Sequence, residues 1–188
     1  MNGPWEVKGT DLKYRNQFIE VREDAVTRPD GEPGTYATVS MKPGVSVVAV
    51  DDDGYTYLTR QFRYALGGES VEVICGSVEE GEIPLAAARR EAAEEAGVSA
   101  ERWDELGHVD MDTSIVSCRS SLFLARGLTF KEPNPESVET LTTLRVHLRE
   151  AVEMVMDSRI THAPSCALIL KAFRLTGQAR GVDPPAAP

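Results

Sequence analysis

The stretch GSVEEGEIPLAAARREAAEEAGV, residues 76–98, carries the strongest structural pattern in the chain. Its second half, residues 84–96, is rich in Ala, Arg and Glu, which favour the α-helix. Pro84 suits the first turn of such a helix, and Gly97 suits the position just past its C-terminus. An apolar stripe recurs at helical spacing and consists of Leu85, Ala88, Ala92 and Ala96. The sequence therefore predicts a helix over residues 84–96 that packs one face against the rest of the protein.

Three glutamates of this helix lie off the stripe or at its edge: Glu91, Glu94 and Glu95. Because they are spaced i, i+3 and i+4, their carboxylates share one face of the helix, where like charges repel. Mg²⁺ prefers oxygen ligands and is often held by a few carboxylates together with waters and phosphates. The helix alone also allows a plainer interpretation, since Arg90 and Glu94 form an ordinary i, i+4 pair on a well-solvated helix.

The wider spacing decides between these interpretations. It reads G-x5-E-x7-R-E-U-x-E-E-x-G-U, where U is a bulky aliphatic residue, and all its fixed positions are filled, by Gly76, Glu82, Arg90, Glu91, Glu94, Glu95 and Gly97. With each residue type at roughly one in fifteen of average composition, a chance match at a given start is on the order of one in 10⁸. The last U is Val98, whereas the first is Ala92, which is smaller than usual. This pattern is the Nudix box, and the chain resembles the Nudix hydrolases.

The resemblance extends over residues 5–176, and its N-terminal part is similar to the ADP-ribose and nucleotide-sugar pyrophosphatases of the superfamily. The shared pattern includes Arg63 and, four residues before Gly76, Glu72. In such relatives the metal ions are held by the box glutamates and by a main-chain carbonyl just before the box glycine. The resemblance therefore implies Mg²⁺, with Mn²⁺ as a possible substitute, held by Glu91, Glu94, Glu95 and the main-chain carbonyl of Cys75.

The resemblance also assigns roles to six residues that are not metal ligands. Arg63 would contact a phosphate and Glu72 would lie near the base or the binding cleft, although apart from the family each could be an ordinary surface residue of a strand. The other four would orient the loop and the helix behind the ligands; they are Gly76, Glu82, Arg90 and Gly97.

The general base is open between a box glutamate and a later loop. Glu95 is the candidate within the box. Relatives usually carry an assisting glutamate in a loop well after the box, and residues 131–140 (KEPNPESVET) fill that place, with Glu139 slightly preferred over Glu136. For either of these two residues, an ordinary acidic loop is an equally good interpretation.

The implied reaction is Mg²⁺-dependent hydrolysis of the diphosphate bond of a nucleoside diphosphate sugar, giving a nucleoside monophosphate and a sugar phosphate. ADP-ribose pyrophosphatases commonly carry a proline shortly past the box, and this chain has none from residue 108 to 129. The sugar nucleotide is therefore left open between ADP-ribose and others such as GDP-mannose and ADP-glucose. Two alternatives are a non-catalytic Nudix-fold nucleotide-binding or regulatory module, which usually lacks box glutamates, and a Nudix enzyme acting on a nucleoside triphosphate or capped RNA.

Strand and helix patterns are mixed along the chain without strict alternation, which favours an α+β fold. Besides the box helix, helices are predicted at 148–157 and 165–176. Strands are predicted at 17–27, 36–41, 45–50, 55–64, 71–75, 103–110, 121–128 and 140–147. The expected architecture is the Nudix fold, a mixed central sheet in an α/β/α sandwich, with an added N-terminal antiparallel β segment. The predicted divisions are residues 1–41 for dimerisation and substrate binding, 42–176 for the Nudix domain, and 177–188 for a disordered tail.

Composition restricts the partners and the compartment. The net charge of −10 argues against non-specific nucleic-acid binding. The three cysteines form no CxxC pair, so neither a disulfide framework nor a Cys₄ zinc site is predicted, and the scattered histidines are interpreted as structural or surface groups. No apolar run is long enough for a bilayer span, and the N-terminus lacks a signal-peptide pattern. We expect a cytoplasmic protein with no membrane or nucleic-acid partner, and the resemblance implies a homodimer.

Overall fold

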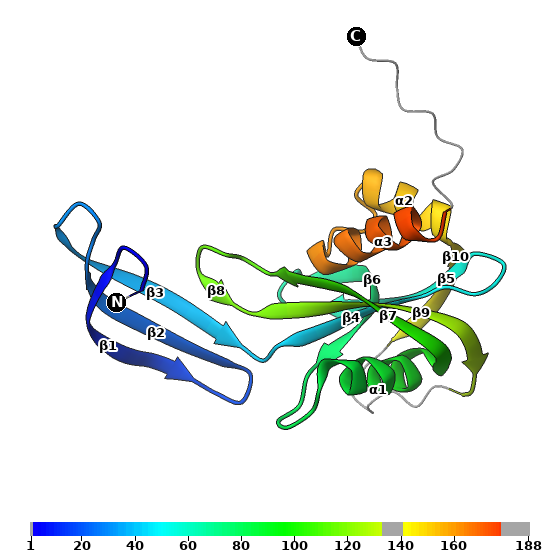
Figure 1. Cartoon of the computed structure of the whole chain (residues 1–188), viewed down its shortest axis with the longest axis horizontal. Helices are drawn as coiled ribbons and strands as arrows, with labels where there is room; N and C mark the ends of the chain where they lie inside the picture. Colours follow the sequence, from blue (N-terminus) through cyan, green and yellow to red (C-terminus); the bar gives the residue numbers. More distant parts are fainter. Residues whose placement is uncertain (1, 133–140, 178–188) are drawn as a thin grey trace, which may run out of the picture. The chain divides into compact units, whose positions relative to one another are not determined.

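The computed structural model describes residues 2–132 and 141–177 (Figure 1). The chain divides into two units, Met1–Pro43 with Asp110–Arg119, and Gly44–Val109 with Ser120–Pro188. The predicted tail falls outside the described residues except for Gly177. The functional division predicted from the sequence, with an N-terminal segment for dimerisation and substrate binding, stays a prediction.

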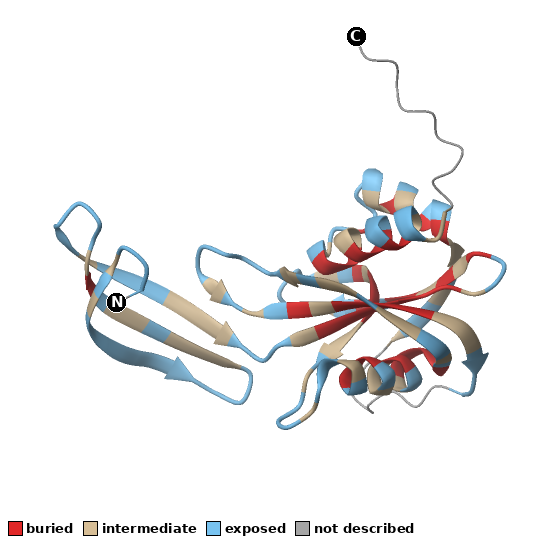
Figure 2. Ribbon diagram, in the orientation of Figure 1, coloured by how far each residue is buried: buried red, intermediate tan, exposed pale blue. Residues whose placement is uncertain are grey.

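The first unit is a four-stranded sheet in the order β1-β2-β3-β8. Its strands are β1 (Glu6–Arg15), β2 (Ile19–Thr27), β3 (Pro33–Met41) and β8 (Val116–Ser117). The first three pair antiparallel in sequence order, and β8 lies parallel to β3. Most side chains of this sheet are exposed or half-buried, as the pale colours of Figure 2 show. The predicted antiparallel N-terminal segment is confirmed.

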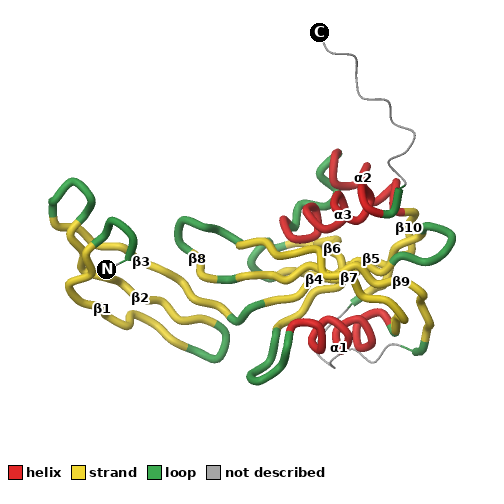
Figure 3. Tube along the Cα trace, in the orientation of Figure 1, coloured by secondary structure: helices red, strands yellow, loops and turns green. Residues whose placement is uncertain are grey.

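The second unit is built on a six-stranded sheet in the order β10-β5-β6-β4-β9-β7. Its strands are β4 (Gly44–Ala49), β5 (Tyr55–Arg63), β6 (Gly68–Ser77), β7 (Val98–Asp110), β9 (Arg119–Phe130) and β10 (Thr142–His147). The sheet is mixed, because β4 runs parallel to β9 but antiparallel to β6. Helix α1 (Pro84–Ala96) covers one face, and α2 (Leu148–Met156) and α3 (Ala163–Leu175) cover the other (Figure 3). The predicted α/β/α sandwich is confirmed.

Alternating residues of the central strand β4 belong to two apolar clusters, one on each face of the sheet. Val47 packs in the cluster that contains the buried alanines of α1, and Val48 packs in the cluster formed with α2 and α3. Ala92, the small residue in the box, is fully buried in the first cluster. Burying apolar surface is the main favourable contribution to folding, so these clusters fix α1 against the sheet.

The start of α3 lies where β4 and β6 part. The two strands pair over residues 44–47 and 74–77. Just before this segment, the Val73 N–H donates to the Ser165 hydroxyl oxygen at 2.9 Å instead. The residue that precedes α3, His162, is thereby brought close to β6.

The turn between β4 and β5 is organised by Asp51. Its Oδ1 accepts hydrogen bonds from the backbone N–H groups of Asp53 and Tyr55, at 3.1 and 2.8 Å. Its Oδ2 accepts from the Tyr57 hydroxyl at 3.1 Å and from the Arg145 guanidinium at 2.9 Å. Partial burial alone would raise the pKa of Asp51, but these hydrogen bonds outweigh it and lower that pKa.

Asp51→Asn should lower the free energy of unfolding at neutral pH by about 1–3 kcal/mol, because charge-assisted hydrogen bonds are replaced by weaker ones. A carboxyl whose folded-state pKa is depressed stabilises the fold fully above its unfolded pKa, about 3.9, and the contribution is lost as pH falls through the folded pKa. Urea denaturation of both proteins at pH 7 and then in steps below about pH 4 measures this difference. We expect the difference to shrink on acidification, with the exposed Asp53→Asn as a control of small effect. A difference independent of pH would contradict this account of Asp51.

Candidate functional site

Helix α1 has the predicted bounds, and both ends follow from local sequence. Pro84 occupies the first turn, where a missing N–H removes no intrahelical hydrogen bond. Gly97 adopts the left-handed conformation with φ 62° and ψ 23°, and its N–H is directed to the carbonyls of Ala92 and Ala93. Glycine takes up this conformation without steric cost, so the box glycine at its end stops the helix.

The other box glycine, Gly76, lies on β6 directly beneath Glu91. A Cβ atom built on Gly76 would come within 1.9 Å of both Cδ and Oε1 of Glu91. The Glu91 side chain is 13% exposed and occupies the space that any larger residue at position 76 would fill. The first position of the box is therefore glycine because a carboxylate rests on its backbone.

Arg90 connects the loop before α1 to the helix through hydrogen bonds. Its guanidinium donates to both carboxylate oxygens of Glu82, at 3.2 and 3.1 Å, and to the Ser77 carbonyl at 2.9 Å. It also donates to Glu91 at 2.7 Å and to Glu94 at 3.2 Å. The hydrogen bond from Arg90 lowers the pKa of Glu82, which keeps this carboxylate ionised. Arg90 thus offsets part of the negative charge that the box gathers.

Glu95 is directed at β6. It is 5% exposed, and its Oε2 accepts a hydrogen bond of 3.3 Å from the Cys75 N–H. Glu91 and Glu95 therefore lie against neighbouring residues of β6, Gly76 and Cys75. Among the described residues, the three box glutamates do not form a set in which one oxygen of each lies within 4.8 Å of the other two. They form a row of anionic groups along α1 and not a closed cage around one point.

A second charged group lies on β5 and β6, where Arg63 and Glu72 form a bidentate ion pair. Nε and one terminal nitrogen of Arg63 donate to the two oxygens of Glu72 at 2.9 and 2.6 Å. The Glu72 side chain is 3% exposed and that of Arg63 is 38% exposed. Burial alone would raise the pKa of Glu72, but the hydrogen bonds from Arg63 and the nearby His162 lower it. Glu72 is thus not the exposed strand glutamate that the sequence alone allowed.

Comparison with known families accounts for this arrangement. A family model described as the NUDIX domain matches residues 41–159, which is more than half of the chain. The chain belongs to the Nudix hydrolase family. A second family model, the nucleoside diphosphate sugar hydrolase N-terminal domain, matches residues 5–39 of this Nudix protein. That match spans β1, β2 and most of β3.

Individual relatives of the Nudix chain carry different names. It is 26% identical over 153 residues to the methanol dehydrogenase activator of Bacillus methanolicus, covering 80% of this chain and 83% of the relative. It is 27% identical over 164 residues to the ADP-ribose pyrophosphatase of Bacillus subtilis (strain 168), covering 86% and 88%. A solved structure titled as an ADP compounds hydrolase superposes with a TM-score of 0.80 at 21% identity, covering 94% of this chain and 96% of that one. At this identity the superposition shows a shared fold.

The structure places most of the predicted residues of the Nudix chain along β6 and on α1 and β5 beside it. Glu91, Glu95 and the Cys75 backbone meet at its C-terminal end, with Glu82, Arg90 and Glu94 joined to them through hydrogen bonds. Arg63 and Glu72 lie further back along the same strand pair. Glu136 and Glu139 lie outside the described residues. The chemical roles of all these residues stay predictions.

Sequence reasoning missed His162 and its surroundings. His162 Nδ1 lies 2.8 Å from the Ser165 hydroxyl and 3.6 Å from Oε2 of Glu72. Burial lowers the pKa of His162, which favours the neutral ring, and burial raises the pKa of the neighbouring Cys75 thiol. No spacing in the sequence links His162 to β6, because α3 reaches that strand only through the tertiary fold.

The sequence also led us to expect a protein without a membrane-spanning segment. In the described part of the chain, none of the helices has the length and apolar character that a bilayer crossing requires.

Proposed function

We propose that this Nudix hydrolase uses Mg²⁺ to cleave the diphosphate bond of a nucleoside diphosphate sugar. The observation that carries the proposal is the row of box carboxylates set against β6, with Glu91 resting on Gly76 and Glu95 buried at Cys75. Like charges gathered on one helix face cost stability, and Arg90 pairs with two of them, Glu91 and Glu94. Oxygen ligands gathered in this way suit a divalent cation such as Mg²⁺.

The donor set fits a hard divalent ion. Nudix hydrolases generally use divalent metal ions. Each carboxylate offers about four lone-pair sites, so the hydrogen bonds from Arg90 leave Glu91 and Glu94 able to bind a cation as well. We propose Glu91, Glu94, Glu95 and the Cys75 main-chain carbonyl as the ligands, with Mn²⁺ as a substitute for Mg²⁺. When bound, the ion offsets phosphate charge and makes a water a stronger nucleophile.

The remaining chemistry is assigned to the chain's own residues. Water attacks one phosphorus in line, the bridging P–O bond breaks, and the proton of the water passes to a carboxylate. Glu95 is one candidate for this general base, and Glu139 and Glu136, which lie outside the described residues, are the others. Arg63 carries the positive charge proposed to contact a phosphate, and Glu72 holds its guanidinium in place. The hydrogen bond from Arg90 to Glu82 holds the loop before α1 against the helix.

The substrate class rests on the N-terminal sheet and on the names of relatives. Residues 5–39 match the N-terminal domain of nucleoside diphosphate sugar hydrolases, and one relative is named for ADP-ribose. The products would be a nucleoside monophosphate and a sugar phosphate.

A substrate panel tests this proposal. ADP-ribose, ADP-glucose, GDP-mannose, UDP-glucose and a dinucleoside polyphosphate are each incubated with the full chain and Mg²⁺, and products are separated by chromatography. We expect a nucleotide sugar to give the fastest turnover. Faster cleavage of a nucleoside triphosphate or of a capped oligoribonucleotide, added as further samples, would overturn the substrate class. Calorimetric binding of a nucleotide sugar without any turnover would instead indicate a non-catalytic binding module.

We also propose a homodimer formed through the N-terminal sheet. Large apolar side chains of this unit are exposed in the single chain, and they include Leu12, Tyr14, Phe18 and Met41. Contiguous exposed apolar surface marks association sites, and we propose that these side chains contribute to one. Light scattering after gel filtration should give twice the chain mass of 20.5 kDa. A monomer at micromolar concentration would rule the dimer out.

We also propose a cytoplasmic location. The three cysteines are free, as is usual in a reducing compartment. Cell fractionation with an antibody against the protein checks this, and recovery in the membrane or secreted fraction would contradict it.

A further inference from the structure

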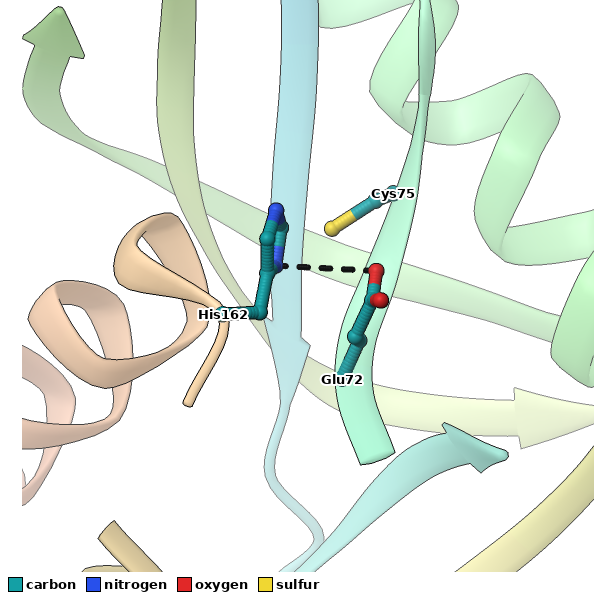
Figure 4. Close-up of side chains that lie close together, drawn as sticks. All are labelled: Glu72, Cys75 and His162. Carbon is teal, nitrogen blue, oxygen red and sulfur yellow. Dashed lines mark ion pairs between the residues drawn. The ribbon is translucent and has the colours of Figure 1, made fainter. Parts of the chain in front are cut away.

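Two side chains that the proposed reaction leaves unused converge with Glu72 beside β6. Figure 4 shows the Cys75 thiol and the His162 imidazole pointing toward the Glu72 carboxylate. One possible ligand atom from each of the three residues lies within 4.8 Å of the other two. Cys75 and Glu72 come from one strand, whereas His162 precedes α3 far along the chain.

The cluster is held in place by its neighbours. Ser165 accepts the Val73 N–H and lies within 2.8 Å of His162 Nδ1, which fixes the ring beside β6. On the other side, the Ser46 hydroxyl lies 3.4 Å from the Cys75 sulfur. His162 lies beyond residues 41–159, which match the Nudix domain, so this grouping is not contained in the family match.

The donor set differs in kind from that of the box. A thiolate, an imidazole and a carboxylate are the ligands of Zn²⁺ and related ions, whereas Mg²⁺ takes oxygen ligands. Tetrahedral zinc with ordinary bond lengths sets its ligand atoms roughly 3.4–3.6 Å apart. His162 Nδ1 lies 3.6 Å from Glu72 Oε2, and one possible ligand atom of each residue lies within 4.8 Å of the other two. Closing the site would exchange the hydrogen bonds of these two atoms to Ser165 and Arg63 for bonds to the cation. Water would complete the fourth position.

We propose that Glu72, Cys75 and His162 bind a thiophilic divalent cation of the Zn²⁺ type, and that its binding inhibits the hydrolase. Binding converts the Cys75 thiol to a thiolate, and the proton passes to solvent. The backbone of Cys75 contacts Glu95, and Glu72 holds Arg63, so moving these two side chains onto a cation disturbs both parts of the site. The inhibitory effect rests on the proposed function, whereas the binding itself does not.

Cobalt absorption spectroscopy tests the binding. The full chain is freed of metal and titrated with Co²⁺, a spectroscopic probe for zinc sites. We expect a thiolate-to-cobalt charge-transfer band in the near ultraviolet that Zn²⁺ abolishes by competition. The band should be lost in Cys75→Ser and persist in the matched controls Cys118→Ser and Cys166→Ser, which alter the other two thiols.

A second variant distinguishes the loss of a metal ligand from misfolding of Cys75→Ser. His162→Gln keeps every thiol and should weaken Co²⁺ binding roughly tenfold or more, since even groups behind metal ligands cost that much when lost. Circular dichroism melting curves show whether each variant is folded. No band in the wild-type chain, a band that survives in folded Cys75→Ser, or a band lost in Cys166→Ser but not in Cys75→Ser would overturn the site.

Inhibition is measured separately, on the fastest substrate of the panel. Zn²⁺ is added at micromolar concentration over saturating Mg²⁺, and each variant's rate is divided by its own rate without Zn²⁺. We expect Cys75→Ser and His162→Gln to need roughly tenfold more Zn²⁺ than the wild type for the same fractional loss. Equal sensitivity would overturn the inhibitory role. A wild type that hydrolyses no substrate would refute the proposed function and leave the cobalt result to decide the site.

Discussion

Glu95→Gln is expected to lower turnover on the order of 10²–10⁴-fold while leaving the fold in place. The side chain is 5% exposed and accepts the Cys75 N–H through one oxygen. A glutamine has the same shape and retains a carbonyl oxygen for this bond, so the packing beneath α1 is preserved. What it lacks is the negative charge that a metal ligand or a general base requires. Steady-state kinetics on the best substrate, with a thermal melt of each protein, measures the two effects separately.

Glu80→Gln is the matched control for Glu95→Gln. Glu80 is exposed, lies in the loop of the same motif at a position where any residue is allowed, and loses the same charge. Its turnover should remain within about twofold of the wild type, as for surface substitutions away from special features. Turnover by Glu95→Gln close to that of Glu80→Gln would remove Glu95 from both the catalytic and the metal-binding roles.

Gly76→Ala is expected to lower the turnover rate while leaving the free energy of unfolding nearly unchanged. The added methyl group would come within 1.9 Å of the Glu91 carboxylate, so that side chain must turn away. The clashing atoms are Cγ, Cδ and Oε1 of the Glu91 side chain, which must change rotamer, and no backbone atom is among them. Gly76 does not have a positive φ, so the strand itself tolerates alanine. Displacing a metal ligand by an ångström or more can cost on the order of 10²-fold in rate. We expect that loss together with a change in unfolding free energy within about 1 kcal/mol.

Gly68→Ala provides the comparison on the same strand. A Cβ on Gly68 meets nothing within 4 Å, and its φ is not positive either. This variant should keep the wild-type rate. Equal rates for Gly76→Ala and Gly68→Ala would mean that Glu91 is not needed in its observed position, whereas a large stability loss in Gly76→Ala would mean that the clash is not relieved by the side chain.

Local sequence predicts the helices of this fold well. Helix α1 begins at Pro84 and ends at Ala96 as predicted, because Pro84 and Gly97 define its ends without help from the rest of the fold. The core strands were found, and β4 and β5 have the predicted bounds to within one residue, but other strands are longer than predicted. Strand β6 was predicted at 71–75 and extends over Gly68–Ser77, because it pairs with β5 before the apolar residues and with β4 after them.

Strands without an apolar face could not be predicted. Strand β1 is exposed at nearly every position, so it lacks the apolar alternation by which half-buried strands are recognised. The two-residue strand β8 exists because it pairs with β3, a long-range contact that its own sequence does not encode. Both strands belong to the N-terminal unit, where sequence patterning is weakest.

The site residues that lie close together in the sequence could be predicted, whereas those brought together by the fold could not. The box spacing identified the carboxylates on α1 and the glycine beneath them before any contact was known. The burial of Glu72 and the approach of His162 depend on how the start of α3 packs against β6, which no local pattern reveals. The cluster that could bind a thiophilic cation therefore emerged only from the fold.

Metal dependence with product identification tests the central claim most directly. The full chain is treated with excess EDTA, exchanged into metal-free buffer, and incubated with its best nucleotide sugar before and after addition of Mg²⁺ or Mn²⁺. The account predicts background turnover without metal, recovery with either ion, and release of a nucleoside monophosphate and a sugar phosphate. Full turnover in excess EDTA, or products other than these two, would contradict it.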